Sequence, residues 1–509
     1  MRVARFPAPG VAARSVRWHP LVLLPLALSL LVFFPITRVF FFADDFLHLA
    51  NIASGQWLNF VLAPFGGHNL HLRNLAFLGS WWLFGFNPEP FYWTVLITHL
   101  VNVWLLFGVL ALLTDSVLLA CFGAILWGTS PLGVGTLGFY SVYGQVMATT
   151  GVLVVLDRFA AWGQRDAPVP PRTAWGCYAL LLAGTTCFGT AIGVACVAPL
   201  VLFLMVPAAW WQRRIRFGYC TLPVVTLAAY FALKRLYLLL DSSSLVEMYQ
   251  EALAYHGLPA VPMMLSHLLG FGVAGTTLGF FFDPDQYGTP GYKPGWVAIA
   301  CFLVGLVLLL WRGDAQTRRD ALAMAVLAFG AYSVIAVGRG NLYSAVKVPP
   351  ARAAAYVRYH YLATFPIAVL WCLILRQLLA SRAVLSVVAV GIAVMMLLGY
   401  RHAAPLIDEH VQVRAFFERT AQEVTAAVAA APPGGPVVLE NGTTPGCLGY
   451  FLEIRIPGRA GAYLLLASSG RTANERRVRF IERDPKILAY WTERPTERMT
   501  ELLIPPPEP

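Results

Sequence analysis

The stretch Phe40-Phe41-Phe42-Ala43-Asp44-Asp45-Phe46-Leu47-His48 places two adjacent carboxylates directly after a long apolar run. An ionised carboxylate inside hydrocarbon costs about 3 kcal/mol or more, so a pair at a membrane boundary indicates a function. In a helix, His48 would follow the aspartates by three and four residues and lie on their side. This pattern predicts a general base, or a group that binds a cation or a sugar hydroxyl. The alternative is an exposed first helical turn, where the helix dipole favours aspartate.

The composition is that of an integral membrane protein. Of the 509 residues, 58% are hydrophobic and 12% are charged, whereas a soluble domain has about 25% charged residues. The net charge is +11, but the basic residues are scattered, which argues against nucleic acid as a partner. Basic residues in short loops instead set the topology, and those on the far side can bind anionic substrates.

Arginines orient the first apolar segment. The first 18 residues carry four arginines ahead of the apolar run 21–34, and no small-residue cleavage site follows. The positive-inside rule therefore predicts an uncleaved first span with a cytoplasmic N-terminus. Asp44 and Asp45 are then extracytoplasmic, in a multi-pass protein of the inner (plasma) membrane.

Further apolar runs predict a polytopic α-helical membrane domain over residues 1–400 with about eleven transmembrane helices. The predicted spans are 21–42, 91–113, 117–137, 141–156, two helices within 174–211, 217–240, 296–311, 321–337, 359–375 and 384–400. Arginines in the connections 157–173, 212–216 and 312–320 predict that these are cytoplasmic. The glycine-rich run 263–282 is predicted to be re-entrant or superficial, because counting it as a span would place Arg312 outside.

Two external loops and a small domain complete the predicted organisation. Residues 43–90 form a long external loop, in which 72–86 lies along the membrane. Residues 338–357 form a second one, which carries three basic residues against the charge rule. Residues 401–509 are more polar and predict a small extracytoplasmic α/β domain, with a helix at 407–430 and strands at 437–440, 463–467 and 478–482.

This topology gathers candidate site residues on the external face. They are Asp44, Asp45, His48, His68, His71, Arg73, Arg339, Arg358, Tyr359 and His360. Arg358 begins a predicted span and could extend its side chain to the lipid headgroups. Its planar guanidinium can also bind a phosphate through two parallel hydrogen bonds. Carboxylates opposite such arginines at a membrane surface predict transfer from a lipid phosphate.

The order of these motifs resembles the GT-C superfamily of polyprenyl-phosphate-sugar-dependent glycosyltransferases, especially bacterial members related to protein O-mannosyltransferases. The matching pieces are ADDF at 43–46, HLRNLAFLGSWWLFGFNPEPFYWTVLITHLVNVWLLF at 71–107 and ARAAAYVRYHYLATFPIAVL at 351–370. The second is similar to the family's arginine-containing juxtamembrane helix, Gly-Phe-Asn-Pro corner and His/Asn-bearing second span. The third has Val357 where the family often has serine before Arg-Tyr. The resemblance covers about residues 20–400.

The resemblance implies an inverting transfer from a dolichyl- or undecaprenyl-phosphate-linked sugar to a hydroxyl of a protein, glycolipid or cell-envelope glycan. Asp44 matches the catalytic aspartate, and Asp45 is its neighbour. Arg358 and Arg339 are the candidates to stabilise the leaving phosphate. His68 and His71 would orient the sugar or hold a divalent metal ion; hydrogen bonding is the commoner role for two loop histidines.

Two other functions remain open from the residues alone. In a lipid-linked sugar transporter or flippase, the same polar groups would line a translocation path, with charges near the middle of spans and inverted repeats. The sequence has few mid-span charges, chiefly Lys234 and Arg235, and no evident repeat. A non-catalytic cell-envelope assembly protein would use its external domain, but this function leaves the two aspartates unexplained.

Overall fold

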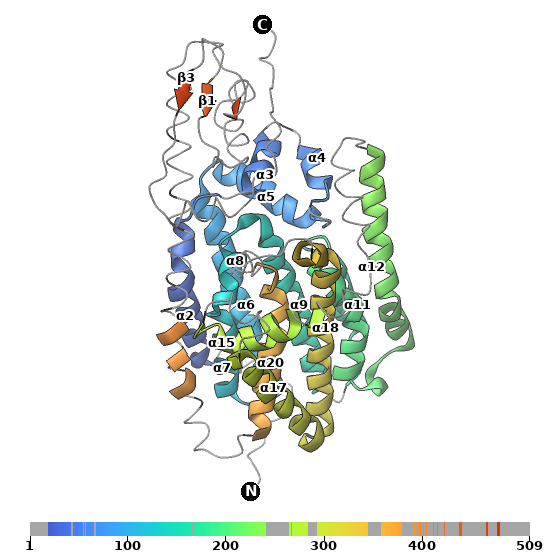
Figure 1. Ribbon diagram of the computed structural model, residues 1–509. Helices are drawn as coiled ribbons and strands as arrows, with labels where there is room; N and C mark the ends of the chain where they lie inside the picture. The colour runs from blue at the N-terminus through green and yellow to red at the C-terminus, as the bar shows by residue number, and fades with distance from the viewer. Residues whose placement is uncertain are drawn as a thin grey trace.

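The computed structural model describes residues 19–41, 44–53, 55, 57–65, 68–164, 167–240, 264–265, 267–282, 293–344 and 358–378, with short helical pieces, single residues and three short strands between 388 and 478. In this part the protein is a bundle of long helices with a group of shorter helices, α3 to α5, at one end (Figure 1). We call this end the α3 end.

Seven helices of the described residues are long and apolar enough to cross a membrane, or eight if one bent pair is a single span. They are Pro20–Arg38 with α2 (Leu23–Phe33), α6 (Pro88–Thr114), Tyr140–Gly163 with α9 (Tyr143–Gly163), α12 (Arg213–Leu240), α17 (Lys293–Arg312), α18 (Ala315–Ser344) and α20 (Tyr361–Leu378). The predicted total of eleven is not confirmed. Of the last predicted span, 384–400, the structure describes 388, 390–392, 394–395 and 397–399, and all of these residues are helical.

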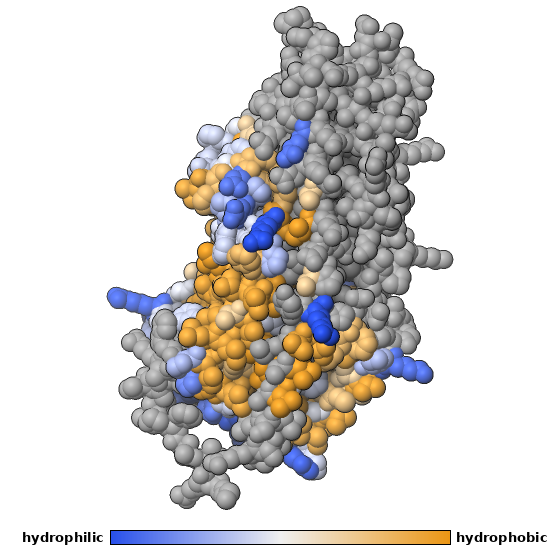
Figure 2. Space-filling model, turned by 90° about the vertical axis from the view of Figure 1, so that its left-hand side faces the viewer, coloured by the Kyte–Doolittle hydropathy of each residue, from blue (hydrophilic) through white to orange (hydrophobic). Residues whose placement is uncertain are grey.

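The outer surface of these helices is apolar. Figure 2 shows apolar side chains gathered over one face, with hydrophilic ones above them and along the lower edge. Large apolar side chains are exposed on α2, α12 and α17, for example Leu31, Phe217 and Val307. Exposed apolar rows on long helices are expected where hydrocarbon replaces water as the solvent. The chain is therefore a multi-pass membrane protein, as its composition predicts.

The predicted span 117–137 is not one straight helix. Helix α7 (Val117–Gly128) ends before Pro131, and a second piece, which includes α8 (Val134–Leu137), follows at an angle of 47°. Pro131 is the first residue of that second piece, and Ser130 before it is extended. A proline disfavours the helical conformation in the residue before it, but it is well suited to the first position of a helix. Pro131 therefore explains why one helix ends before it and another begins at it. The apolar pattern alone did not reveal it.

The predicted pair within 174–211 is present as α10 (Pro171–Gly184) and α11 (Thr190–Met205). Helix α11 packs closely on α18 through glycines. A Cβ atom on Gly193 would lie 1.9 Å from the carbonyl oxygen of Gly330. Small residues at such a crossing let two helix backbones approach in a membrane protein.

The predicted external loop 43–90 contains short helices, and none of them is among the candidate membrane spans of the described residues. It contains α3 (Asp44–Ala53), α4 (Trp57–Leu62) and α5 (His71–Phe84). Helix α5 exposes Trp82 and Leu83 while it buries Arg73 and Phe77. This two-sided pattern is what stabilises a helix on a core.

Arg339 does not lie in a loop. Helix α18 continues to Ser344, two turns beyond the predicted end at Val337. The run Gly338-Arg339-Gly340 looks like a helix end, but a helix can continue out of the hydrocarbon where an arginine is no longer costly. The segment 263–282 also contains helices, η6 (His267–Ala274, a π-helix) and α15 (Gly275–Leu278). Together they are too short to cross a membrane straight.

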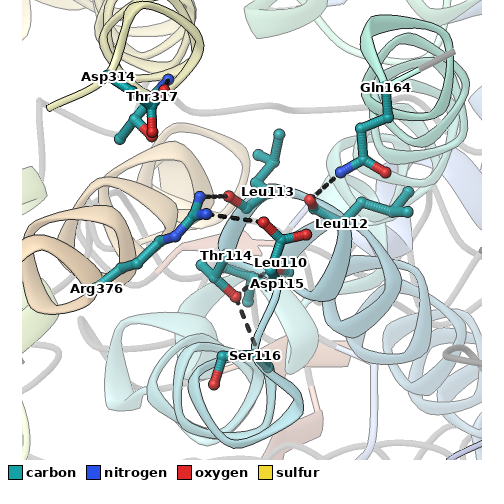
Figure 3. A network of polar contacts seen from close by, with 10 residues as sticks. All are labelled: Leu110, Leu112, Leu113, Thr114, Asp115, Ser116, Gln164, Asp314, Thr317 and Arg376. Atoms are coloured by element: carbon teal, nitrogen blue, oxygen red, sulfur yellow. Dashed lines mark hydrogen bonds and ion pairs between the residues drawn. The ribbon is translucent and has the colours of Figure 1, made fainter. Parts of the chain in front are cut away.

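The end of the bundle opposite the α3 end is held by polar caps (Figure 3). Arg376 of α20 donates to the carbonyl oxygen of Leu113 at 2.8 Å and pairs with Asp115 at 2.8 Å. Gln164 donates to the carbonyl oxygen of Leu112. These contacts satisfy carbonyl groups that the end of α6 leaves without helical partners. They also place the ends of α6, α9 and α20 together, as the alternating topology requires.

Three short strands are described in the C-terminal part. They are β1 (Val437–Leu439), β2 (Leu465–Leu466) and β3 (Arg476–Val478), and they form a parallel sheet in the order β2-β1-β3. They fall at or beside the three predicted strands and lie at the α3 end in Figure 1. The remainder of the predicted domain 401–509, including the helix 407–430, lies almost wholly outside the described residues and stays a prediction.

Candidate functional site

The two adjacent aspartates have different environments. Both lie in the first turn of α3, where the helix dipole favours them. Asp45 is fully buried, and its Oδ1 accepts hydrogen bonds from the Ser141 N–H at 2.7 Å and the Ser141 hydroxyl at 2.5 Å. The Tyr92 hydroxyl donates to its Oδ2 at 3.3 Å. Asp44 is half-buried, and no hydrogen bond or ion pair joins it to another described residue. Asp45 is therefore held in place, while Asp44 keeps both oxygens available.

His48 lies on the buried side of α3 and contacts Arg73. The Arg73 Nη2 lies 3.2 Å from the His48 Nε2. A guanidinium only donates, so Nε2 accepts and the neutral imidazole carries its proton on Nδ1. Burial, and then the Arg73 charge, hold the pKa of His48 well below its usual value. His48 is therefore a neutral acceptor that orients a fully buried arginine.

Arg358 is half-buried and lies on the bent segment between α7 and α9. Its guanidinium carbon is 5.4 Å from the centre of the Phe139 ring, and its carbonyl oxygen accepts from the Thr136 hydroxyl at 2.6 Å. A Cβ atom on Gly135 would lie 2.9 Å from the Arg358 nitrogen, so only glycine allows this approach. Tyr359 beside it is buried, with its ring 5.2 Å from the guanidinium.

The bent segment 131–142 therefore joins two groups of candidate residues. Through Ser141 it holds Asp45, and through Thr136 and Phe139 it holds Arg358. The hydroxyl of its Tyr140 shares a hydrogen bond with the hydroxyl of Ser80 in α5 at 2.9 Å. Asp45 and Arg358, which are far apart in the sequence, thus both contact this one segment.

His68 and His71 lie against the turn between α10 and α11. His68 stacks on Phe188 at 4.7 Å, and the Phe188 ring in turn lies 6.4 Å from that of Tyr359. His71 is half-buried at the start of α5, next to Leu72, whose N–H donates to Thr186 of the same turn at 3.1 Å. Burial lowers the pKa of His71. The two histidines thus border the site near Tyr359.

His360 is buried in a group of aromatic rings. Its Nδ1 lies 3.3 Å from the Tyr332 hydroxyl, and its ring stacks on Phe271 at 4.4 Å and on His267 at 5.6 Å. Burial, and then His267, keep the pKa of His360 well below its usual value. Arg339 lies seven residues after Tyr332 on α18, about 10 Å further along the helix axis. Its side chain lies outside the described part.

Polar residues deeper in the bundle form a closed network. The His99 Nε2 donates to the Gly128 carbonyl oxygen at 2.9 Å, so its Nδ1 accepts from the Tyr361 hydroxyl at 2.7 Å. Asn102 donates to that hydroxyl and to the Val146 carbonyl oxygen, and its own oxygen accepts from Thr150. His99 and Asn102 thus join α6 to α7, α9 and α20.

Several residues that build the site were not foreseen. Ser141, Tyr92, Thr136 and Phe139 hold the aspartate and the arginine, but each looks ordinary in an apolar run. The one available signal was Ser130-Pro131, which marks a break close to the membrane boundary. Among the described residues, no group of three or more His, Cys, Asp or Glu side chains could hold a metal ion.

Comparison with known proteins adds a similarity to solved structures. No protein-family model and no curated protein matches the sequence. A solved structure of ArnT from Cupriavidus metallidurans, described as bound to undecaprenyl phosphate, is similar with a TM-score of 0.48 and 14% sequence identity. The match covers 88% of this chain and 86% of that one. We transfer no function from a similarity at this level.

Proposed function

We propose that the protein is an inverting glycosyltransferase that moves a sugar from a polyprenyl-phosphate-linked donor to an acceptor hydroxyl on the external membrane face. The observation that carries the proposal is the bent segment 131–142, which contacts both the acidic start of α3 and Arg358. The resemblance of the sequence motifs to GT-C enzymes points to the same chemistry. The acceptor would be a protein, a glycolipid or a cell-envelope glycan.

The proposed reaction assigns separate tasks to the two aspartates. The acceptor oxygen attacks the anomeric carbon from the side opposite the lipid phosphate, and the bond from that carbon to the phosphate oxygen breaks with its electron pair on the phosphate. The Asp44 carboxylate takes the hydroxyl proton. Asp45 is a positioning residue, because its oxygens are already engaged by Ser141 and Tyr92.

The departing phosphate gains negative charge and needs a cation fixed in advance. Arg358 is our first candidate and Arg339 the second. Arg73 is fully buried behind Phe77 and His48, so we propose that it stabilises the acidic helix start from within. His68, His71, Tyr359 and His360 are left as candidates for contacts with the sugar.

The test is a transfer assay with the purified full-length protein and undecaprenyl-phosphate sugars (glucose, mannose, galactose, arabinose), in which release of undecaprenyl phosphate is measured. Asp44→Asn preserves shape but removes the base, and turnover should fall about 100-fold or more. The matched control is Asp115→Asn, which alters a solvent-exposed aspartate at the opposite end and should leave turnover unchanged.

Two outcomes would count against the proposal in different ways. Normal turnover by Asp44→Asn would remove Asp44 as the base. If the wild type neither binds nor consumes any lipid-phosphate sugar, the glycosyltransferase function itself is wrong, and a transport assay for lipid-linked sugars becomes the next experiment.

A further inference from the structure

Gln145 lies in the first turn of α9, four residues after the serine that holds Asp45. Its side chain is fully buried, and neither its amide nitrogen nor its amide oxygen has a hydrogen-bond partner among the described residues. Among the buried Asn and Gln side chains of the described residues, Gln145 is the one whose nitrogen and oxygen both lack a hydrogen-bond partner. Ser141 and Gln145 are about 6 Å apart along the helix axis and on one face.

A buried amide without partners is unfavourable for folding. It reduces the folded population about tenfold or more, and more than about 90% of buried polar groups in proteins are paired for this reason. The same bundle pairs another buried amide completely, since Asn102 uses both its nitrogen and its oxygen with Val146, Tyr361 and Thr150. Local violations of this kind are expected where a protein binds a ligand.

The surroundings of Gln145 connect it to the candidate site. A Cβ atom on the preceding Gly144 would lie 1.9 Å from the Cys187 carbonyl oxygen and 3.1 Å from the Arg73 Cβ. This turn of α9 is therefore packed between α5 and the turn that leads into α11. The first residue of α11 is Thr190, whose hydroxyl is also buried and without a partner among the described residues.

We infer that Gln145 binds the sugar of the lipid-linked donor, with its amide donating to one ring hydroxyl and accepting from another. This inference rests on the proposed function and names a residue that selects its substrate. An amide carries no charge, so it suits hydroxyl groups better than phosphate, which Arg358 can bind through its charge. A polyprenyl tail has no polar atoms and would leave the amide unpaired, so the sugar is the part of the donor that fits.

The test compares binding of undecaprenyl phosphate with that of its glucose, mannose, galactose and arabinose derivatives to the full-length protein in detergent. Gln145→Met keeps the volume but removes the polar atoms. The preference of the protein for sugar-carrying lipid over bare undecaprenyl phosphate should fall about tenfold, the effect of two neutral hydrogen bonds. Binding of the bare lipid should not change, and the melting temperature without ligand should rise.

Asn102→Leu is the matched control, because it removes a buried amide that is fully paired. It should lower the melting temperature and leave the preference for sugar-carrying lipid intact. A merely structural Gln145 would behave like Asn102, and a fall in the melting temperature of Gln145→Met would overturn the inference. A rise in melting temperature with an unchanged preference would also overturn it, and would indicate a bound water only.

Failure of the inference differs from failure of the proposed function. If the wild type prefers a sugar-carrying lipid and Gln145→Met keeps that preference, only the role of Gln145 is wrong. If the wild type binds neither the bare lipid nor any sugar derivative, the glycosyltransferase proposal fails and the inference fails with it.

Discussion

Replacing Ser141 with alanine should destabilise the protein by removing one charge-assisted hydrogen bond from Asp45. The hydroxyl lies 2.5 Å from the Asp45 Oδ1, whereas the Ser141 N–H, at 2.7 Å, survives the substitution. A hydrogen bond to a charged group contributes about 1.5–3 kcal/mol. We therefore expect the free energy of unfolding to fall by about that amount. Unfolding in mixed SDS micelles, followed by tryptophan fluorescence, measures it.

The matched control is Ser333→Ala in α18. The Ser333 hydroxyl donates to the Gly330 carbonyl oxygen at 2.8 Å, within its own helix, so its loss should cost less than about 1 kcal/mol. A double-mutant cycle isolates the contribution of charge. In an Asp45→Asn background the hydroxyl bond becomes neutral, so Ser141→Ala should cost about 1 kcal/mol less than in the wild type.

The expected consequence for activity is a lower turnover, because Asp45 sits beside the proposed base and Ser141 fixes it. Two results would refute the reasoning. One is a cost of Ser141→Ala no larger than that of Ser333→Ala. The other is an equal cost with aspartate and with asparagine at position 45, since Ser141 would then not be bound to an ionised carboxylate.

If Arg358 binds the lipid phosphate through two parallel N–H hydrogen bonds, Arg358→Ala should weaken binding of undecaprenyl phosphate by about 1.5–3 kcal/mol, and Arg358→Lys should weaken it less. Equal affinities of the wild type and both variants in a binding titration would show that Arg358 serves only to anchor the protein in the membrane. Because the pKa of His48 is lowered in the folded protein, only the unfolded chain binds a proton at this histidine when the pH falls below about 6.5. Below that pH, His48 should therefore reduce the free energy of unfolding by about 1.4 kcal/mol per pH unit. Melting temperatures at pH 7.5 and 5.5 should therefore differ less for His48→Asn; an unchanged difference contradicts this. Finally, Asn87 and Asp115 lie at opposite ends of α6. Of the variants Asn87→Cys and Asp115→Cys, only the first should react with an impermeant thiol reagent in intact cells. Labelling of the second variant alone would show that the topology is opposite to the predicted one.

The membrane character of the chain and most long helices could be predicted from the sequence. Long apolar runs separated by arginine-containing connections are local features, and they decide which segments hydrocarbon can accept. The position of Asp44 and Asp45 in a first helical turn also follows from neighbouring residues, since an acidic pair after an apolar run favours a helix start.

The failures have a different character. The sequence predicts a span that ends at Val337 and a loop that contains Arg339, whereas helix α18 continues to Ser344. The span 117–137 was expected to be continuous, although Pro131 restarts it at a new angle. The break at Pro131 follows from the backbone restriction that proline imposes, which a hydropathy pattern does not record.

The candidate site itself depends on contacts between distant parts of the chain. Asp45 meets a serine 96 positions away, and the carbonyl oxygen of Arg358 meets a hydroxyl 222 positions away. Hydropathy and helical periodicity describe each segment's preference for lipid or water, so they are readable one segment at a time. Which groups become hydrogen-bond partners in the interior is determined only when the helices pack. For this reason, only the tertiary structure shows that, among the described residues, Asp45 is hydrogen-bonded while Asp44 is not, and that the amide of Gln145 is unpaired.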